Sequence, residues 1–575
     1  MPPCQGGDRR FESAGGPQRT CSKPADSAGF VLCFEFAIDR ANWILPAPVV
    51  LSVPPTDNGS VTEPSLSSHV SYDELPYDGG CVRSSHPLRM AAMGRLFGMQ
   101  APDPRTARVL ELGCGGGSNL LPMAYGLPDA RFVGIHLSSR QIEIAQARAA
   151  QLQLPNIDLL ALDILDTSRL HGEFDYIICH GVFSWVPDPV RDAIFATIRS
   201  RLSPQGMAFV SYNALPGWHL RRAVRDMMVY HSRYFPDLEE RAVQARALVD
   251  FVNDSTGELS QVITGIEIHH QAVAATREVI ARYPDYYVVH EFLEQDNQAF
   301  YLYEFVERLN AAGLQYVGDS SLAAMVSHNL PDAIAATLDR ISLTNVALEQ
   351  YRDFLVNRAF RHTLICRPDV QLERTIPPET AYCLFFRIAQ CDPDHADPGQ
   401  AQGADGRMVD IRTSEALAVV AELRTRYPSA ASFEAICTAT GIRNREKLAG
   451  LLLNLPAQDV VEVSVGSFPA VERSRRQMLW PPARLFASEG LPLPAPSHQV
   501  ITIASVGQRI ASLIDGSRTN AEILRDAVSI LRASGETFQV EQQAVDASDL
   551  TRSQAETMAK RVIRSLRHHG VLSGR

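Results

Sequence analysis

The sequence lacks the cysteine patterns of a metal-binding or disulfide-linked protein. Its ten cysteines are scattered, form no Cys-x-x-Cys pair and have no histidine partner at metal-ligand spacing, so neither a zinc site nor a disulfide framework is indicated. Long apolar runs are also missing, because the most apolar early segment, residues 30–51, is interrupted by Glu35, Asp39 and Arg40, and a membrane helix needs about 20 apolar residues. We expect no membrane span, no secretory signal and a reduced, cytoplasmic protein.

Lysine is scarce as well, and the basic residues are almost all arginine. Lysine occurs only at Lys23, Lys447 and Lys560, and the formal net charge is −11 with a pI near 5.8. Affinity for the phosphate backbone of nucleic acids comes from clustered lysine and arginine. The composition therefore predicts no nucleic-acid partner, and acidic substrates are not favoured either.

The sequence is long enough, and has enough apolar residues, to form several domains. Its 575 residues correspond to about three domains by length, and 45% hydrophobic with 21% charged residues is an ordinary globular balance. Residues 1–67 are rich in Gly, Pro and Ser and are expected to be a disordered extension without a function. The expected division beyond it is 68–216 for an α/β domain with an N-terminal cap, 217–365 for a helical middle domain, 366–466 for a winged-helix-like domain and 467–575 for a C-terminal helical region.

A glycine-rich turn follows the first buried strand of the α/β part. The stretch 108–119 begins with apolar residues, carries an acid at Glu111 and continues with alternate glycines at Gly113, Gly115 and Gly117. Glycines are needed where the backbone turns tightly and a ligand approaches the N–H groups at the start of a helix. Taken alone, the turn fits either an ordinary strand-to-helix loop or a cofactor site.

The elements after this turn alternate strictly between strand and helix. Strands are expected at 108–112, 130–135, 157–162, 174–179 and 207–212, with a capping-box spacing at 138–141 opening the helix after the second strand. This order predicts a Rossmann-like, doubly wound, mainly parallel sheet whose ligand binds beyond the carboxyl ends of the strands. Helices at 414–427, 432–441 and 444–455, followed by a strand at 460–465, resemble a winged helix.

The spacing of the glycines distinguishes between two cofactor classes. A dinucleotide fingerprint would place its third glycine at position 118, which is Ser118. The pattern acid-x-Gly-x-Gly-x-Gly instead resembles motif I of the class I S-adenosylmethionine-dependent methyltransferases. Asp163, at the end of the third strand, and Phe174-Asp-Tyr-Ile-Ile178 resemble further motifs of that family. The family's antiparallel last strand would fall late or be formed by the segment after Gly217.

Several longer stretches carry a closer resemblance. The segments 72–77, 86–87, 180–187, 211–219, 290–293 and 313–316 resemble bacterial methyltransferases with a regulatory domain, a group that includes the rickettsial protein-lysine methyltransferases acting on outer-membrane protein. The resemblance covers about 68–575 and implies a methyltransferase domain at 68–216, a helical regulatory domain and a winged-helix-like C-terminal part. It implies S-adenosyl-L-methionine as cofactor and does not transfer a substrate.

One position departs from the family pattern. After the second strand the family usually reads Gly-Ile-Asp, whose acid holds both ribose hydroxyls, whereas this chain has Gly134, Ile135 and His136. A neutral histidine offers a single acceptor nitrogen and cannot accept from both hydroxyls. We predict retained binding with His136 facing the ribose, and the alternative is a noncatalytic cofactor-binding scaffold. The cofactor-binding residues that the resemblance implies are Glu111, Gly113, Gly115, Gly117, Asn119, His136, Leu137, Asp163, Ile164 and His180.

Methyl transfer needs positioning and electrostatics more than a nucleophilic side chain. The catalytic candidates follow the fourth and fifth strands, and they are His180, Trp185, Tyr212 and Asn213. Aromatic faces suit a sulfonium and a methylated ammonium. Phe183 and Trp218 are therefore further candidates for lining the acceptor pocket, on the rim where the methyl group would lie. The alternative is that the aromatics are core or lid packing and that His180 is a hydrogen-bonded buried histidine.

The acceptor and the partners follow from the same resemblance. We predict methylation of a protein side-chain amine, a lysine, with small-molecule methylation as the runner-up. Arg473, Arg475 and Arg476 raise the alternative of a DNA-binding regulator, but the acids around them and the negative net charge favour an interaction or dimerisation module, which leaves a homodimer open. The adjacent His568 and His569 are expected on solvated helix surface rather than at a metal.

Overall fold

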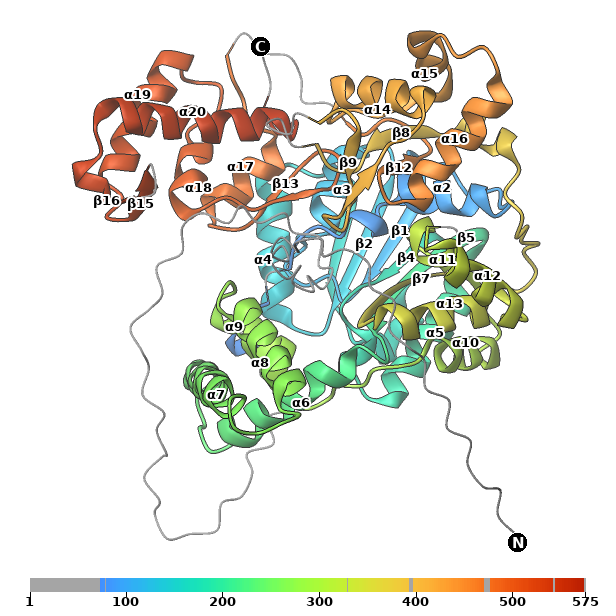
Figure 1. Cartoon of the computed structure of the whole chain (residues 1–575), viewed down its shortest axis with the longest axis horizontal. Helices are drawn as coiled ribbons and strands as arrows, with labels where there is room; N and C mark the ends of the chain where they lie inside the picture. Colours follow the sequence, from blue (N-terminus) through green and yellow to red (C-terminus); the bar gives the residue numbers. More distant parts are fainter. Residues whose placement is uncertain are drawn as a thin grey trace, which may run out of the picture. The chain divides into compact units, whose positions relative to one another are not determined.

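The computed structural model describes residues 73–77, 79–327, 329–391, 397–469, 476–540 and 543–572. The extension expected at 1–67, together with Arg473 and Arg475, lies outside these ranges. The centre of the fold is a seven-stranded sheet with the order β3-β2-β1-β4-β5-β7-β6 (Figure 1). Its strands are β1 Arg108–Leu112, β2 Arg131–His136, β3 Ile157–Ala161, β4 Phe174–Cys179, β5 Leu202–Asn213, β6 Gln315–Asp319 and β7 Phe360–Cys366.

The first five strands pair in parallel, and β7 is antiparallel to both of its neighbours, β5 and β6. The expected doubly wound, mainly parallel sheet is therefore confirmed. The strand that the resemblance left open is β7, and 146 residues separate it from the end of β5. The range expected to be a helical domain thus also supplies two strands of the sheet.

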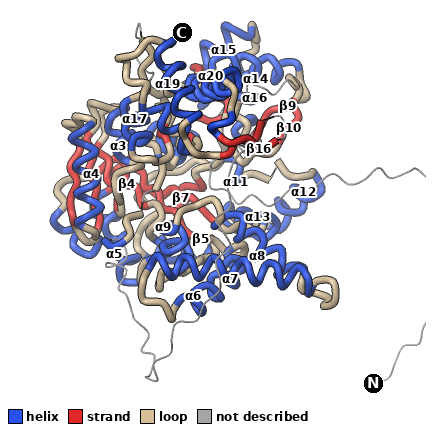
Figure 2. Tube along the Cα trace, turned by 90° about the vertical axis from the view of Figure 1, so that its left-hand side faces the viewer, coloured by secondary structure: helices blue, strands red, loops and turns tan. Residues whose placement is uncertain are grey.

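Helices cover both faces of the sheet. On one face, α2 (Pro87–Leu96) and α3 (Leu120–Gly126) pack with Val109 and Phe209, whereas on the other α5 (Asp188–Arg201) and α10 (Leu302–Ala311) pack with Leu110 and Ile177. Figure 2 shows the strands of the sheet with helices such as α4 (Ser139–Gln151) and α5 running beside them. The carboxyl ends of β1 to β5 are the edge at which a ligand is expected.

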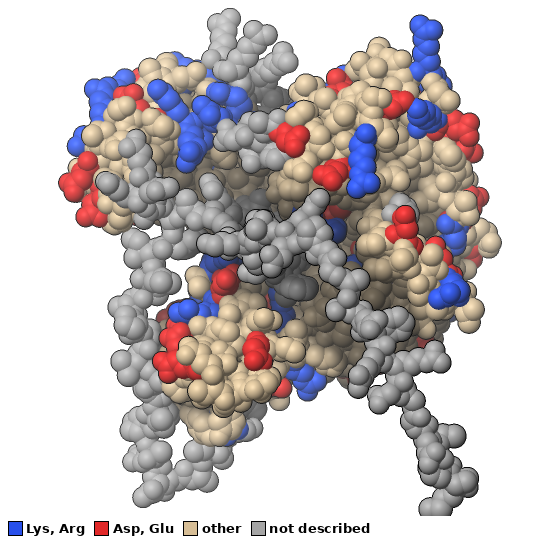
Figure 3. All heavy atoms as spheres, in the orientation of Figure 1, with Lys and Arg blue, Asp and Glu red and all other residues tan. Residues whose placement is uncertain are grey.

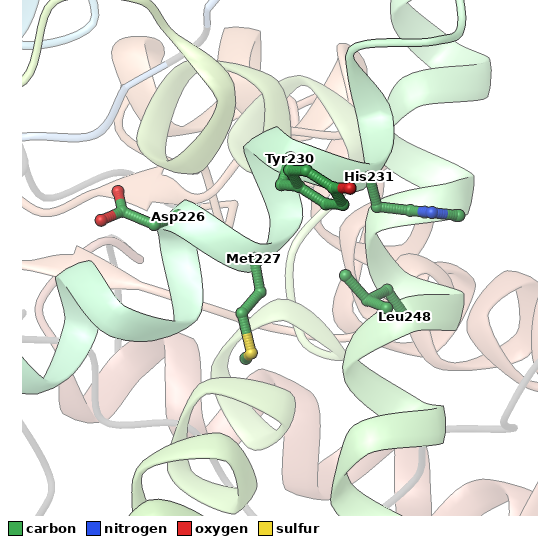
Figure 4. Close-up of a pocket in the computed structure, with 5 residues that line it drawn as sticks. All are labelled: Asp226, Met227, Tyr230, His231 and Leu248. Atoms are coloured by element: carbon green, nitrogen blue, oxygen red, sulfur yellow. The ribbon is translucent and has the colours of Figure 1, made fainter.

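A helical unit follows the fifth strand, as the sequence predicted. It comprises α6 Trp218–Ser232, α7 Leu238–Leu259, α8 Glu267–Ile280, α9 Asp285–Val288 and a π-helical turn at Val289–Leu293. Val224, Val249 and Val273 are among the buried residues of its own core. A shallow hollow of about 430 Å³ lies on α6 and α7 (Figure 4), where Asp226 points away from Leu248. The hollow is lined by Asp226, Met227, Tyr230, His231 and Leu248.

Between β6 and β7 the chain forms α11 Leu322–Met325, α12 Asp332–Ile341 and α13 Asn345–Val356. The next region contains α14 Ser414–Arg426, β11 Ala431–Ser432, α15 Phe433–Thr440, α16 Arg445–Ala457 and β12 Val461–Ser464, close to the expected ranges. The strand β8 (Phe385–Ile388) precedes these helices and pairs with both β11 and β12. The middle strand of this three-stranded sheet therefore precedes α14 in the chain. The winged-helix assignment stays a prediction.

The C-terminal region is helical with two short strand pairs. Its elements are α17 Pro481–Ser488, β13 Leu493–Pro494, β14 Val500–Ile501, α18 Ser505–Ser512, α19 Asn520–Arg532, β15 Thr537–Val540, β16 Gln543–Asp546 and α20 Arg552–His568. His568 and His569 are half-buried, and the Nε2 atom of His568 contacts the carbonyl of Cys391. The expectation that this pair lies on solvated helix surface is corrected, because α20 packs these side chains against the neighbouring region.

The surface of the described residues mixes both charges. Figure 3 shows acidic and basic side chains interspersed, with a gathering of lysine and arginine over the C-terminal helices. On α20 the exposed basic residues are Arg552, Lys560, Arg561, Arg564 and Arg567. Among the described helices, none combines the length and the apolar character needed to cross a membrane.

Candidate active site

The glycine turn after β1 requires backbone conformations that other residues rarely adopt. Gly113, Gly115 and Gly117 have φ angles of 81°, 51° and 80°, in the left-handed region that favours glycine. A Cβ atom on Gly113 would lie 2.4 Å from Cγ2 of Val182. A Cβ on Gly115 would instead meet nothing closer than the Tyr77 carbonyl oxygen at 3.8 Å. The second glycine therefore faces a space that a ligand can approach.

A buried carboxylate lies beneath this turn. Glu111 is 3% exposed, and its Oε1 accepts a hydrogen bond from Nδ2 of Asn119 at 2.7 Å. Its Oε2 is buried without a hydrogen-bond partner in the part of the chain that the structure describes. Burial raises the pKa of Glu111 to about 7 because the charged form loses its hydration.

Two further polar side-chain atoms around the turn are, like Oε2 of Glu111, buried and unpartnered among the described residues. They are the Oγ of Ser118 and the Oε1 of Gln141. Gln141 lies in the first turn of α4, and its Oε1 would be 3.9 Å from a Cβ on Gly115. Unpartnered buried polar atoms cost free energy. A cofactor with an ammonium group and a polar sugar would satisfy such atoms, so the residues present fit S-adenosylmethionine.

His136 ends β2 and contacts the glycine turn directly. The Gly115 N–H donates to its Nδ1 at 3.3 Å. Burial lowers the pKa of His136 to about 4, so the ring is neutral at pH 7 and its Nε2 carries the proton. The acceptor nitrogen is thus already used, and His136 can only donate to a ribose hydroxyl. Leu137, the next residue, is 41% exposed.

The N-terminal cap brings a carboxylate to this end of β2. Ser138 caps α4 by accepting from the N–H of Gln141 at 3.1 Å, and its own hydroxyl donates to Asp73. Burial lowers the pKa of His136, and the negative charge of Asp73 partly opposes that shift because it raises the pKa. No residue pattern in the sequence assigns a role to Asp73, whose one signal is that it belongs to the segment 72–77.

The same cap segment continues toward the helical unit. The Tyr77 carbonyl accepts from Nε2 of Gln141 at 3.1 Å, while the Tyr77 hydroxyl donates to Glu291 at 3.2 Å. Nε2 of His290 lies 2.7 Å from the Leu75 carbonyl. Residues 73–77 therefore lie between the start of α4 and the π-helical turn.

The adenine end of the expected site is formed after β3. The Oδ1 of Asp163 accepts from the N–H of Leu165 at 2.9 Å and caps the 3-10 turn Ile164–Arg169. Asp163 and Ile164 are half-buried. They follow the strand that pairs with β2, so the structure brings them to the same sheet edge as His136.

His180 follows β4 on the acceptor side. Its Nδ1 lies 2.9 Å from the Oγ of Ser211, which also accepts from the N–H of Gly181 at 2.9 Å. Burial and the nearby His362 lower the pKa of His180 to about 3, so its ring is neutral at pH 7. The ring centroids of His180 and His362 are 6.0 Å apart. His362 comes from β7, which no local sequence motif connected with this site.

The alternation of side chains along β5 separates the two polar candidates. Ser211 and Asn213 point to the face that carries His180, and Tyr212 points to the opposite face. Tyr212 is 1% exposed, and its ring stacks on Phe305 with centroids 4.1 Å apart. Thr363 donates to its hydroxyl at 3.3 Å, and burial raises its pKa. The structure thus places Tyr212 in the core beside Phe183, on the opposite face of β5 from Ser211 and Asn213.

Asn213 ends β5, and Trp185 lies in the 3-10 turn Phe183–Trp185 that follows β4. Asn213 is 2% exposed, and its Nδ2 has no hydrogen-bond partner among the described residues. Trp185 is half-buried and meets Trp218 edge to face, with centroids 6.2 Å apart. Nε1 of Trp218 donates to Asn297 at 2.9 Å. Phe183 and Trp218 are buried, so Trp185 is the one member of the predicted aromatic set that is partly exposed.

Comparisons with known proteins agree with this geometry. Residues 109–206 match the model of a methyltransferase domain, and residues 284–367 match that of a predicted methyltransferase regulatory domain. The second match includes β6 and β7, which complete the sheet. The family described as regulatory therefore also contributes to the fold of the catalytic core.

Two of the relatives are proteins of Rickettsia prowazekii. An uncharacterised protein of Rickettsia prowazekii is 39% identical over 319 residues, which is 56% of each chain, so the match spans about half of that relative's length. A second uncharacterised protein of the same organism is 38% identical over 242 residues, 42% of this chain and 94% of the relative. PKMT2 from Rickettsia typhi in complex with AdoHcy superposes with a TM-score of 0.72 at 27% identity, covering 86% of this chain and 100% of that one. The chain belongs to the class I S-adenosylmethionine-dependent methyltransferases that carry a methyltransferase regulatory domain.

Proposed function

We propose that this protein transfers a methyl group from S-adenosylmethionine to the side-chain amine of a lysine in a protein. The observation that carries the proposal is the extent of the match to PKMT2, which includes all of that chain rather than the Rossmann-like core alone. A trans-aconitate 2-methyltransferase of Deinococcus radiodurans matches at 31% identity over only 113 residues, 20% of this chain. Small-molecule methylation is therefore supported only through the shared core.

The cofactor would be held by the turn and strand ends described above. When bound, it supplies an electrophilic methyl group on a sulfonium. Glu111 offers its buried Oε2 to the ammonium group, and His136 donates its Nε2 proton to a ribose hydroxyl. Gly115 leaves room for the ligand because no side chain fills the space at its Cα. Asp163 and Ile164 form the adenine end.

The acceptor side of the site is neutral and partly aromatic. A lysine must lose its proton to act as a nucleophile, and a cation beside it would also repel the sulfonium. His180 stays uncharged because burial lowers its pKa to about 3. We assign Asn213 to orienting the amine, since its carboxamide is buried on the same face of β5 as Ser211, which contacts His180. Trp185 offers an aromatic face for the methylated ammonium.

Tyr212 is left out of the proposed acceptor site. Its hydroxyl contacts Thr363 and its ring stacks on Phe305, so it supports the strand that carries Asn213. The catalytic role predicted for it from the sequence is replaced by packing in this proposal.

The proposal is tested by labelling. The purified protein is incubated with tritium-labelled cofactor and a lysate of its own cell, and labelled protein is hydrolysed to identify the methylated amino acid. A matched lysate whose lysines have been blocked by chemical acetylation, which turns each amine into a non-nucleophilic amide, is the control. We expect label in methyl-lysine from the first lysate and none from the control. Label only in small molecules, or equal label after blocking, would overturn the protein-lysine assignment.

A further inference from the structure

A histidine from the C-terminal region reaches the glycine turn. His498 lies between β13 and β14, has a φ of 62° and is 1% exposed. Its Nε2 is 2.8 Å from Oδ1 of Asn119, the residue that immediately precedes α3. The two residues are 379 positions apart in the chain.

The hydrogen bonds around Asn119 determine which way its carboxamide faces. Oδ1 accepts from the N–H of Val82 at 2.8 Å, and a backbone N–H can only donate. The atom facing Val82 and His498 is therefore the oxygen, and His498 donates its Nε2 proton. The Nδ2 atom then faces Oε1 of Glu111 at 2.7 Å and the hydroxyl of Ser85 at 3.2 Å.

A second contact joins the C-terminal region to the other side of the turn. Arg148 of α4 donates from Nη1 to the Gly116 carbonyl at 2.8 Å, and its Nη2 lies 2.7 Å from Glu489. The guanidinium lies over the ring of Phe486, with its carbon 5.4 Å from the ring centroid. Phe486 belongs to the same apolar cluster as Leu121 of α3. The C-terminal region thus contacts the turn at two places through independent side chains.

We propose that the C-terminal region completes the cofactor site, and that His498 is a positioning residue that orients Asn119 and, through it, the carboxylate of Glu111. Removing the His498 donor leaves the Asn119 oxygen with Val82 as its backbone donor and allows the carboxamide to rotate. Glu111 then loses the bond that fixes its Oε1, and Oε2 is no longer held toward the ammonium group. Residues that orient a ligand-binding side chain act in this way without touching the ligand. The inference rests on cofactor binding and is independent of the acceptor.

The test compares three substitutions of His498 by calorimetric titration with S-adenosylmethionine and its demethylated product. For His498→Ala we expect the Kd to rise about tenfold, the effect of one lost hydrogen bond in a buried network. His498→Gln should restore affinity to within about threefold, because its amide nitrogen reaches as far as Nε2 does, whereas the shorter His498→Asn should not. Gln153 shows that glutamine is tolerated at a positive φ in this chain.

His568→Ala is the matched control. This histidine also lies in the C-terminal region, but its Nε2 contacts the Cys391 carbonyl rather than the glycine turn. We expect its Kd to match that of the wild type. Hydrogen exchange of residues 113–120 without cofactor gives a second readout, which should be faster in His498→Ala and unchanged in His568→Ala.

Each outcome decides the inference. Equal Kd values for His498→Ala and the wild type would overturn it. An equal loss of cofactor affinity in His498→Gln and His498→Asn would also overturn it. If His498→Ala does not fold, the comparison of the glutamine and asparagine variants still distinguishes positioning from packing. A wild-type protein that binds cofactor but labels no protein would overturn the proposed acceptor alone, whereas one that binds no cofactor would overturn both.

Discussion

Replacing Glu111 with glutamine should weaken cofactor binding and, at pH 8 relative to pH 4.5, make the cofactor-free protein more stable compared with the wild type. The carboxyl group is 3% exposed, and burial raises its pKa from the ordinary value of 4.5 to about 7. Without cofactor, the folded protein therefore keeps a proton on Glu111 that the unfolded chain has already released between about pH 4.5 and pH 7. Stability falls as pH rises across this window, and above pH 7 the full cost is present.

The size of this cost follows from the pKa of the group. The gap between 4.5 and about 7 corresponds to about 3 kcal/mol of unfolding free energy. A glutamine has no charge to bury, and its oxygen can still accept from Asn119. Its NH₂ group lacks a partner, which costs about 1–3 kcal/mol at every pH. We therefore expect the stability of Glu111→Gln relative to the wild type to be about 3 kcal/mol more favourable at pH 8 than at pH 4.5.

Urea unfolding of the cofactor-free proteins at both pH values measures this difference. The same variant should bind S-adenosylmethionine at least tenfold more weakly at pH 8, because it loses a charge-assisted hydrogen bond to the ammonium group. A relative stability of Glu111→Gln that is the same at both pH values would refute the buried, protonatable carboxyl. Unchanged affinity at pH 8 would refute its assignment to the ammonium group.

The other predictions concern the ribose and acceptor sides. His136→Asp should tighten S-adenosylmethionine binding about five- to tenfold in a calorimetric titration, because a carboxylate can accept from both ribose hydroxyls; weaker binding would contradict the placement of the ribose at β2. Tyr212→Phe should keep kcat within about twofold and lower the unfolding free energy by about 1 kcal/mol, since only the bond to Thr363 is lost; a tenfold fall in kcat would restore a catalytic role. Trp185→Ala should raise the KM for the protein acceptor several-fold while Trp185→Phe keeps it, and equal effects of the two substitutions would argue against an aromatic contact.

Local sequence signals predicted the parallel part of the fold well. The expected strands at 108–112 and 174–179 coincide with β1 and β4, because apolar runs bounded by turn residues identify buried strands. The acid and the alternate glycines of the turn likewise identified the cofactor class. These features depend on neighbouring residues, so a single sequence reveals them.

Features that depend on tertiary packing could not be read in the same way. The strand β7 pairs with β5 across a long helical insertion, and nothing in residues 360–366 indicates that partner. Tyr212 was expected at the acceptor rim, but the side-chain period of two places it on the opposite face from Ser211 and Asn213. The contact of His498 with Asn119 joins segments 379 positions apart and has no local signal.

We propose that this chain binds S-adenosylmethionine at the glycine turn after β1. Calorimetric titration of the purified wild-type protein tests it most directly, with the Glu111→Gln variant beside it at pH 8. We expect one saturable site per chain and a Kd at least tenfold higher in the variant. Absence of heat and of thermal stabilisation in the wild type, or identical binding by the two proteins, would contradict it.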